Sequence, residues 1–144
     1  MQVFIPYADP YLTATALKGD RRFNKQYQEA KQILLAIKDP TKGYANHPVT
    51  KMYKDDVLWL SYYIEVFKWV SIDNRIMARF YAIKANRIKP KWMTSELCDQ
   101  HKRRLYTKNP KHFEIWSSFG ESNENWYVVN GELIKYINGK RIWK

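Results

Sequence analysis

The strongest constraint on the fold is a long apolar stretch in the middle of the chain. Residues 57–70 are apolar on almost every side of a helical projection, and Ser61, Glu65 and Lys68 are the interruptions. A helix that is apolar nearly all round must be surrounded by other elements. We therefore expect residues 55–70 to form the buried centre of a helical domain. Asp55 and Asp56 are expected in its first turn, where the helix dipole favours acidic side chains.

Further helices are indicated on both sides of this centre. Asp9 and Pro10 form an N-cap followed by proline at the first helical position, and Thr94 is a second N-cap. The ranges 10–18, 20–38, 74–87 and 94–108 are therefore predicted to be helical. The second of these has an apolar stripe made of Phe23, Tyr27, Ala30, Leu34 and Ile37.

The two ends of the chain have a different character. Residues 1–7 are apolar and predict either a short strand or a tucked extended arm. Near the other end, Asn130-Gly131 and Asn138-Gly139 separate strand-like runs at 126–129, 132–137 and 140–143, which is typical of tight hairpins. The predicted fold is mainly α: a compact single domain over 1–144, with a helical body at 1–113 and a small antiparallel β-hairpin or meander at 114–144.

Charge points to the class of partner. The chain has 25 Lys and Arg against 14 Asp and Glu, a net charge of +11. Such an excess on a small domain favours a polyanion, unless it serves solubility alone. A membrane partner is not expected, because no strongly amphipathic basic helix with a Trp and Leu face is present. The charge alone supports DNA or RNA as the partner. We expect a monomeric protein.

Metal and cofactor chemistry is not expected. Cys98 is the single cysteine, so neither an internal disulfide nor a thiolate zinc cage can form. None of the three histidines is paired at i, i+4 with a carboxylate in the manner of metal motifs. The first residues lack a signal-peptide pattern, so we expect a cytoplasmic protein.

One helical face carries a candidate catalytic group. Arg22, Gln26 and Glu29 follow one another at steps of four and three, which places them together beside the apolar stripe. A fixed carboxylate can stabilise positive charge that develops on a bound substrate, or transfer protons to and from it. The alternative is a solvated Glu29 paired with Lys25.

Three segments resemble the endonuclease V-type pyrimidine dimer DNA glycosylase family. They are RRFNKQYQEAKQIL at 21–34, GYANHPVTKMY at 43–53 and HKRRLYTKNPKHF at 101–113. The resemblance covers about 1–113 and leaves the hairpin unaccounted for. It implies a DNA glycosylase, with or without AP-lyase activity. Such an enzyme excises a damaged or modified base, a pyrimidine dimer or a modified pyrimidine, after flipping it out of duplex DNA. Because the family includes phage enzymes, a phage-encoded protein acting in the host cell is one origin it allows.

The resemblance also implies roles for particular residues. Glu29 matches the catalytic glutamate, and His47 matches a histidine of the family's loop. The founding phage enzymes attack the sugar with the α-amine of their processed first residue. Here Gln2 predicts that Met1 is retained, so its amine is the candidate nucleophile, with the side chain of Lys25 or a water molecule as the alternatives. Arg22 and Gln28 stand where the phage enzymes have histidine and arginine, which leaves the substrate base open.

Contacts to DNA are expected from basic, amide and aromatic side chains. The predicted DNA-binding residues are Arg22, Lys25, Gln26, Tyr44, Asn46, His101, Arg103, Arg104 and Lys108. His101 also lies on a stripe with Leu97 and Leu105, which favours a half-buried structural histidine. Two other functions remain open: a non-catalytic DNA-binding protein that reuses the fold, and an RNA-binding protein in which hairpin aromatics stack on bases.

Overall fold

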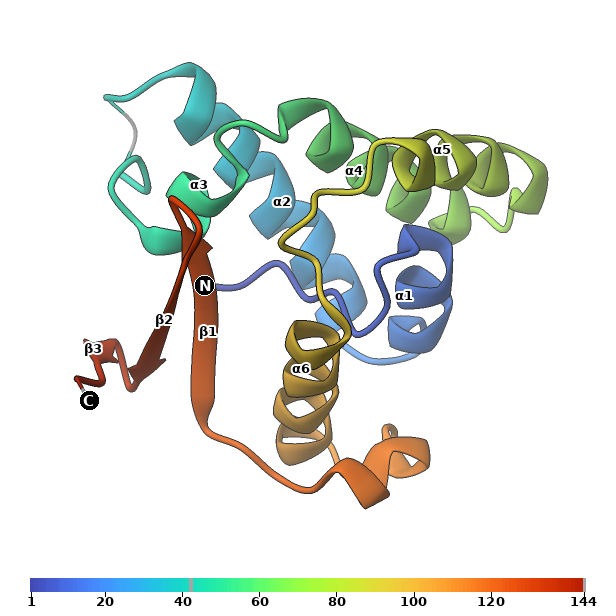
Figure 1. Cartoon of the computed structure of the whole chain (residues 1–144). Helices are drawn as coiled ribbons and strands as arrows, with labels where there is room; N and C mark the ends of the chain where they lie inside the picture. Colours follow the sequence, from blue (N-terminus) through green and yellow to red (C-terminus); the bar gives the residue numbers. More distant parts are fainter. Residues whose placement is uncertain (42, 144) are drawn as a thin grey trace.

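The computed structural model describes residues 1–41 and 43–143, so position 144 of the predicted domain and Lys42 of the predicted loop lie outside it (Figure 1). Within these ranges the fold is mainly helical with a small antiparallel sheet, which confirms the predicted class. The elements are α1 (Pro10–Leu17), α2 (Arg22–Lys38), α3 (Pro48–Tyr53), α4 (Val57–Ser71), α5 (Arg75–Arg87), α6 (Ser95–Lys108), a 3-10 helix η1 (Glu114–Phe119), β1 (Glu124–Val129), β2 (Glu132–Ile137) and β3 (Lys140–Arg141).

Helix α4 lies at the centre, as its sequence predicts. It packs against α1, α2 and α5, and it buries Trp59, Tyr63 and Phe67. The helix begins at Val57, so the prediction that Asp55 and Asp56 lie in its first turn is wrong. The carboxylate of Asp56 accepts a hydrogen bond from the indole Nε1 of Trp92 at 3.0 Å, a long-range contact that the sequence does not reveal.

The buried face of α2 differs from the predicted stripe. Phe23 and Ala30 are buried as expected, but Tyr27, Leu34 and Ile37 lie at its edge and are only partly buried. The centre of the buried face also holds the polar residue Gln26, which is 1% exposed. An apolar pattern could not identify this position, because a buried amide is stable only when its hydrogen bonds are made elsewhere in the fold.

Gln26 holds the N-terminal arm. Residues 1–6 form the tucked extended arm and no strand, and positions 2–6 are buried. Gln26 Oε1 accepts a hydrogen bond from Phe4 N at 2.8 Å, and its Nε2 donates to the Gln2 carbonyl at 3.0 Å. One side chain thus supplies the arm with the donor and the acceptor that a neighbouring strand would otherwise provide.

Two further side chains complete this support. The Tyr63 hydroxyl donates to the Phe4 carbonyl at 2.8 Å, and His101 Nδ1 accepts from Ile5 N at 2.7 Å. His101 is 0% exposed, so the expectations of a half-buried histidine and of a DNA contact are both wrong. Burial, with a smaller effect of the Arg104 charge, lowers the pKa of His101 to about 3. Its neutral ring can therefore keep accepting from Ile5 N.

The loop at residues 43–47 leads directly into a short helix. His47 has extended backbone and precedes Pro48, as predicted, and its Nδ1 caps a short helix, α3, by accepting from Val49 N at 3.1 Å. Neither α3 nor η1 was predicted, because each has only six residues and shows too little periodicity.

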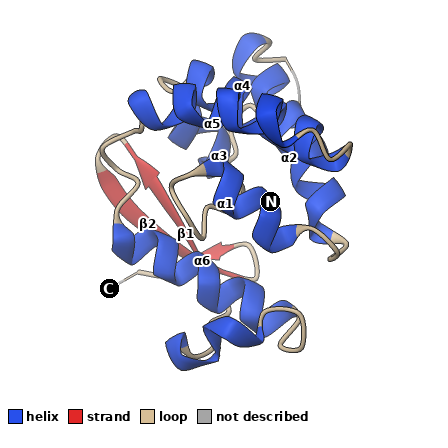
Figure 2. Ribbon diagram, turned by 90° about the vertical axis from the view of Figure 1, so that its right-hand side faces the viewer, coloured by secondary structure: helices blue, strands red, loops and turns tan. Residues whose placement is uncertain are grey.

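The predicted meander forms and packs against the helical body. Its strands pair in the order β1-β2-β3, and Asn130 and Asn138 adopt the positive φ that tight hairpin turns require. The third strand ends at Arg141, two residues earlier than expected. Strand β1 contacts α3 and α6 (Figure 2), and in Figure 1 it runs beside the N-terminus. Within the described ranges, every helix is too short or too polar to cross a membrane.

We predict that His101 makes the stability of the fold pH-dependent. Its folded pKa of about 3 lies below its ordinary value of 6.5, so the unfolded chain binds an extra proton between these limits. The free energy of unfolding should therefore fall as the pH is lowered from 6.5 towards 3, by up to about 1.4 kcal/mol per unit. Urea unfolding across this range measures the slope. His101→Asn retains an acceptor, and its free energy of unfolding should change less steeply with pH. Equal slopes in wild type and variant would show that His101 does not cause the pH dependence.

Candidate functional site

A small polar pocket lies where the N-terminal arm meets α2, α6 and β1. It has a volume of about 70 Å³, the space of roughly two water molecules. It is lined by Met1, Gln2, Phe4, Arg22, Lys25, Gln26, Glu29, Arg104, Lys108 and Asn125. Several residues that the sequence singles out for separate reasons are thus brought to one place. Four of the lining side chains are cationic and one is a carboxylate.

Glu29 is largely enclosed in this pocket. Its side chain is 14% exposed, and its Oε2 accepts from Gln26 Nε2 at 3.3 Å. Its Oε1 lies 3.9 Å from Lys25 Nζ, so the ion pair considered as the alternative role is also present. Because the Lys25 side chain is 67% exposed, that pair contributes little to stability. The carboxylate is held mainly by the same amide that holds the arm.

Arg22 is fixed at the edge of the pocket by Asp20. Its Nη1 lies 3.0 Å from Asp20 Oδ1, and Asp20 Oδ2 also accepts from Asn109 Nδ2 at 2.7 Å. Burial raises the pKa of Asp20, but hydrogen bonds from Arg22 and Asn109 outweigh it and the net shift is downward. Asp20 is therefore an anion that offsets the charge of Arg22.

Met1 places its α-amine at the pocket. Burial lowers the pKa of this amine below 8.0, and the charges of Lys25, Lys108 and Arg104 lower it further. The carboxylate of Glu29 opposes them by stabilising the ammonium form. The balance gives the amine a larger neutral fraction near neutral pH than an ordinary α-amine has.

His47 lies beside Met1 without lining the pocket. Its ring packs edge-to-face on Tyr127, with centroids 5.6 Å apart, and on Tyr44 at 6.5 Å. Burial lowers the pKa of His47, and the Met1 ammonium lowers it further. Since Nδ1 caps α3, Nε2 is the ring nitrogen left for other contacts. The structural role weighed for this residue is thus present, close to the α-amine.

The basic residues of α6 separate into two groups. Arg104 and Lys108 line the pocket one turn apart, and burial lowers the pKa of each. Arg103 points elsewhere: its Nε donates to the Phe119 carbonyl at 3.0 Å, so it contacts the last residue of η1. Of the two predicted loop residues, Tyr44 and Asn46, both are exposed and neither lines the pocket.

Sequence reasoning missed the contribution of the hairpin. Asn125 lines the pocket and accepts from Arg104 Nε at 3.0 Å, while the Tyr127 hydroxyl donates to the Met1 carbonyl at 2.8 Å. Alternation along β1 places these two residues on one face. The aromatic content of the hairpin hinted at function, but its packing partner is a long-range property that no local pattern encodes.

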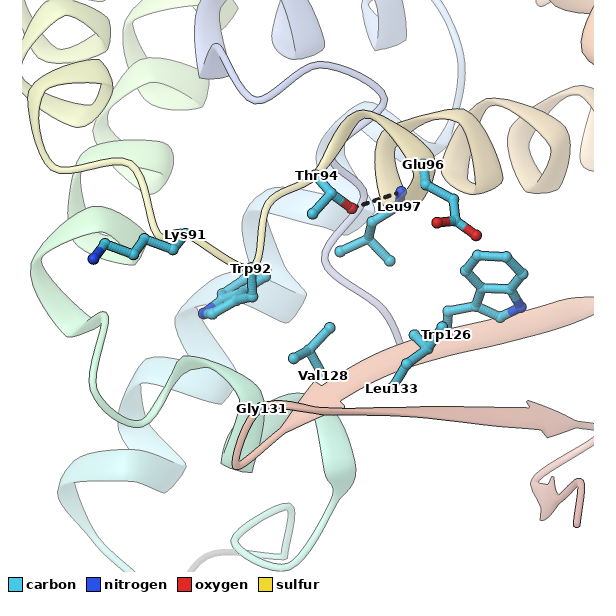
Figure 3. A pocket seen from close by; sticks show the side chains of 9 residues that line it. All are labelled: Lys91, Trp92, Thr94, Glu96, Leu97, Trp126, Val128, Gly131 and Leu133. Carbon is cyan, nitrogen blue, oxygen red and sulfur yellow. Dashed lines mark hydrogen bonds between the residues drawn. The ribbon is translucent and has the colours of Figure 1, made fainter.

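The opposite face of β1 borders a larger and more apolar cavity. It measures about 530 Å³ and is lined by Lys91, Trp92, Thr94, Glu96, Leu97, Trp126, Val128, Gly131 and Leu133 (Figure 3). The Thr94 hydroxyl accepts from Leu97 N as the N-cap of α6. The cavity contains none of the predicted site residues. Among the described residues, no group of three or more His, Cys, Asp or Glu side chains is arranged to hold a metal ion.

We predict that Glu29→Gln lowers the pKa of the Met1 α-amine further. The substitution removes the carboxylate that raises this pKa and leaves the three nearby cations. Competitive acylation at several pH values, read by mass spectrometry of the N-terminal peptide, measures the shift. Glu96→Gln, at an exposed glutamate outside the pocket, is the matched control and should leave the titration unchanged. An unchanged or raised pKa in Glu29→Gln would place the carboxylate away from the amine.

Comparison with known proteins supports the resemblance noted from the sequence. The family model described as pyrimidine dimer DNA glycosylase matches residues 1–68. This range contains the arm, Glu29 and His47, and it leaves out α6 and the hairpin. No curated protein and no solved structure matches the chain. The first 68 residues are thus similar to the pyrimidine dimer DNA glycosylase family.

Proposed function

We propose that the chain is a DNA glycosylase that excises a damaged or modified pyrimidine from duplex DNA. The observation that carries this proposal is the enclosure of Glu29 and the Met1 α-amine in one pocket ringed by cations. The family similarity supports a glycosylase of this general kind. The base remains open between a pyrimidine dimer and a modified pyrimidine.

Glu29 is the proposed catalytic carboxylate. Breaking the bond between base and sugar develops positive charge on the sugar, which a fixed carboxylate in a partly desolvated site can stabilise. The hydrogen bond from Gln26 and the low exposure of the side chain fix its position before substrate arrives. A carboxylate held in this way can also transfer protons during opening of the sugar ring.

The α-amine of Met1 is the proposed nucleophile. Its neutral form donates a lone pair to C1′, and the base leaves with the electrons of the glycosidic bond and takes up a proton. The bond from C1′ to the ring oxygen then breaks, the ring oxygen takes up one proton of the amine and the other passes to solvent, which leaves an imine between Met1 and C1′. Strand cleavage by β-elimination from this imine is the proposed AP-lyase activity. Lys25, the alternative amine, has a side chain that is two-thirds exposed, whereas the Met1 amine is partly buried.

The cations around the pocket are the proposed phosphate contacts. Arg104, Lys108 and Lys25 surround Glu29 on the side where the sugar-phosphate backbone would pass. His47 is proposed to contact the sugar or a phosphate through Nε2. Tyr44, a residue that is 43% exposed beside His47, offers a surface on which an extruded base can stack, with Asn46 next to it.

The small volume of the pocket favours a second candidate, a DNA-binding protein without catalysis. A space of about 70 Å³ admits part of a sugar or a phosphate but no whole nucleotide. In this case the cations bind the backbone and no base is released. Glycosylase activity then requires the pocket to widen or the base to remain outside it.

We predict covalent trapping for the wild-type protein. Borohydride reduces the imine, so incubation with duplexes that carry a pyrimidine dimer, a modified pyrimidine or an abasic site should give a protein–DNA adduct linked at Met1. Glu29→Gln should slow base release at least about 100-fold, while Glu96→Gln retains full activity. Base release without an adduct indicates water as the nucleophile. Tight DNA binding without base release from any duplex supports the second candidate, and full activity of Glu29→Gln would refute the role of the carboxylate.

We predict a phosphate contact for Lys108. Lys108→Ala should weaken binding to all duplexes and reduce the slope of log K against log salt by about 0.9, the value for one phosphate. Fluorescence anisotropy at several salt concentrations measures this slope. Lys89→Ala removes an exposed lysine outside the pocket and should keep the wild-type slope. Equal slopes for the two variants would remove Lys108 from the interface.

A further inference from the structure

The hairpin supplies the anchor of the first residue. The Tyr127 hydroxyl donates to the Met1 carbonyl at 2.8 Å across 126 positions of sequence. Tyr127 is 3% exposed, and its ring lies between those of His47 and Tyr136, at 5.6 and 5.5 Å. These contacts fix the direction of the hydroxyl, and burial raises its pKa to about 12, so it remains a donor at neutral pH.

This anchor differs from the others along the arm. Gln26, Tyr63 and His101 hold backbone groups of residues 2, 4 and 5, whereas Tyr127 holds a backbone group of residue 1. A terminal residue frays unless it is tied down. Since the carbonyl and the α-amine of Met1 are joined through the same Cα, a fixed carbonyl confines the amine to a small region of the pocket.

The same strand makes two more contacts around the amine. The Trp126 carbonyl accepts from Gln2 Nε2 at 3.4 Å, and Asn125 Oδ1 accepts from Arg104 Nε at 3.0 Å. Strand β1 therefore joins the arm to the basic side of the pocket. All three contacts come from residues beyond the family-like segment at 1–68.

We propose that Tyr127 is a positioning residue that holds the α-amine of Met1 beside Glu29, which makes the C-terminal hairpin a working part of the site. The geometric claim stands on the contacts above. Its consequence for catalysis rests on the proposed glycosylase function.

The claim is testable because the environment of the amine is charged on several sides. The titratable and charged groups that face it are Glu29, Lys25 and Arg22 from α2, Arg104 and Lys108 from α6, His47 before α3, and Tyr127 from β1. An amine released from its anchor becomes more hydrated, so the effect of burial on its pKa weakens. The pKa should then rise towards 8.0.

Tyr127→Phe removes the hydroxyl and keeps the ring, so thermal melting should show a folded protein. Tyr136→Phe is the matched control on the neighbouring strand, because no hydrogen bond from its hydroxyl is found among the described residues. Competitive acylation should show a higher pKa for the Met1 amine in Tyr127→Phe alone. Single-turnover trapping with borohydride should slow about tenfold at neutral pH, the scale of one lost hydrogen bond. The difference in trapping rate between Tyr127→Phe and wild type should narrow at higher pH, where both amines are neutral. The Kd for DNA should stay within about twofold of the wild-type value.

The outcomes separate this proposal from the proposed function. An amine titration in Tyr127→Phe that matches wild type overturns the positioning role, whatever the activity. A loss of trapping that is equal at every pH, with an unchanged amine pKa, also overturns it, because a merely structural role gives that result. If wild type traps no duplex, the glycosylase proposal fails, and the amine titration still decides whether Tyr127 holds Met1.

Discussion

The hydrogen bonds between Gln26 and the N-terminal arm are the interaction on which the site depends. A buried extended segment without a partner strand leaves its backbone N–H and C=O groups unpaired, at a cost of about 1–3 kcal/mol each. Gln26 pairs one of each, at Phe4 and Gln2, and it also contacts Glu29. A single amide therefore fixes both the path of the arm and the carboxylate near which the arm ends.

The electrostatics of the pocket follow from this placement. Helix α2 contributes Glu29 and Lys25, α6 contributes Arg104 and Lys108, and the arm brings the Met1 amine between them. An amine among cations and partly removed from water favours its neutral form. The nearby carboxylate keeps this effect from becoming larger. The pocket thus holds an α-amine whose pKa is lowered by burial close to a carboxylate that opposes this shift.

Sequence patterns predicted the parts of this fold that depend on neighbouring residues. The central helix, the Thr94 cap and the Asn-Gly turns are encoded locally, and the structure has them. Properties that depend on distant partners were missed or misjudged. His101 was expected to contact DNA, yet it supports the backbone of Ile5, and Tyr127 had no predicted role although it contacts Met1. In both cases the partner lies about 100 residues away or more, where periodicity carries no information.

The contact between Tyr127 and Met1 also has a consequence for the order of events during synthesis. The ribosome makes the arm before the hairpin, so a nascent chain holds residue 1 without this anchor until residue 127 has emerged. Gln26 and Tyr63 are available earlier and can seat the inner part of the arm. A chain that stops before the hairpin can form most of the helical core while its first residue stays loose. The pocket is therefore complete only once the hairpin has packed against the arm.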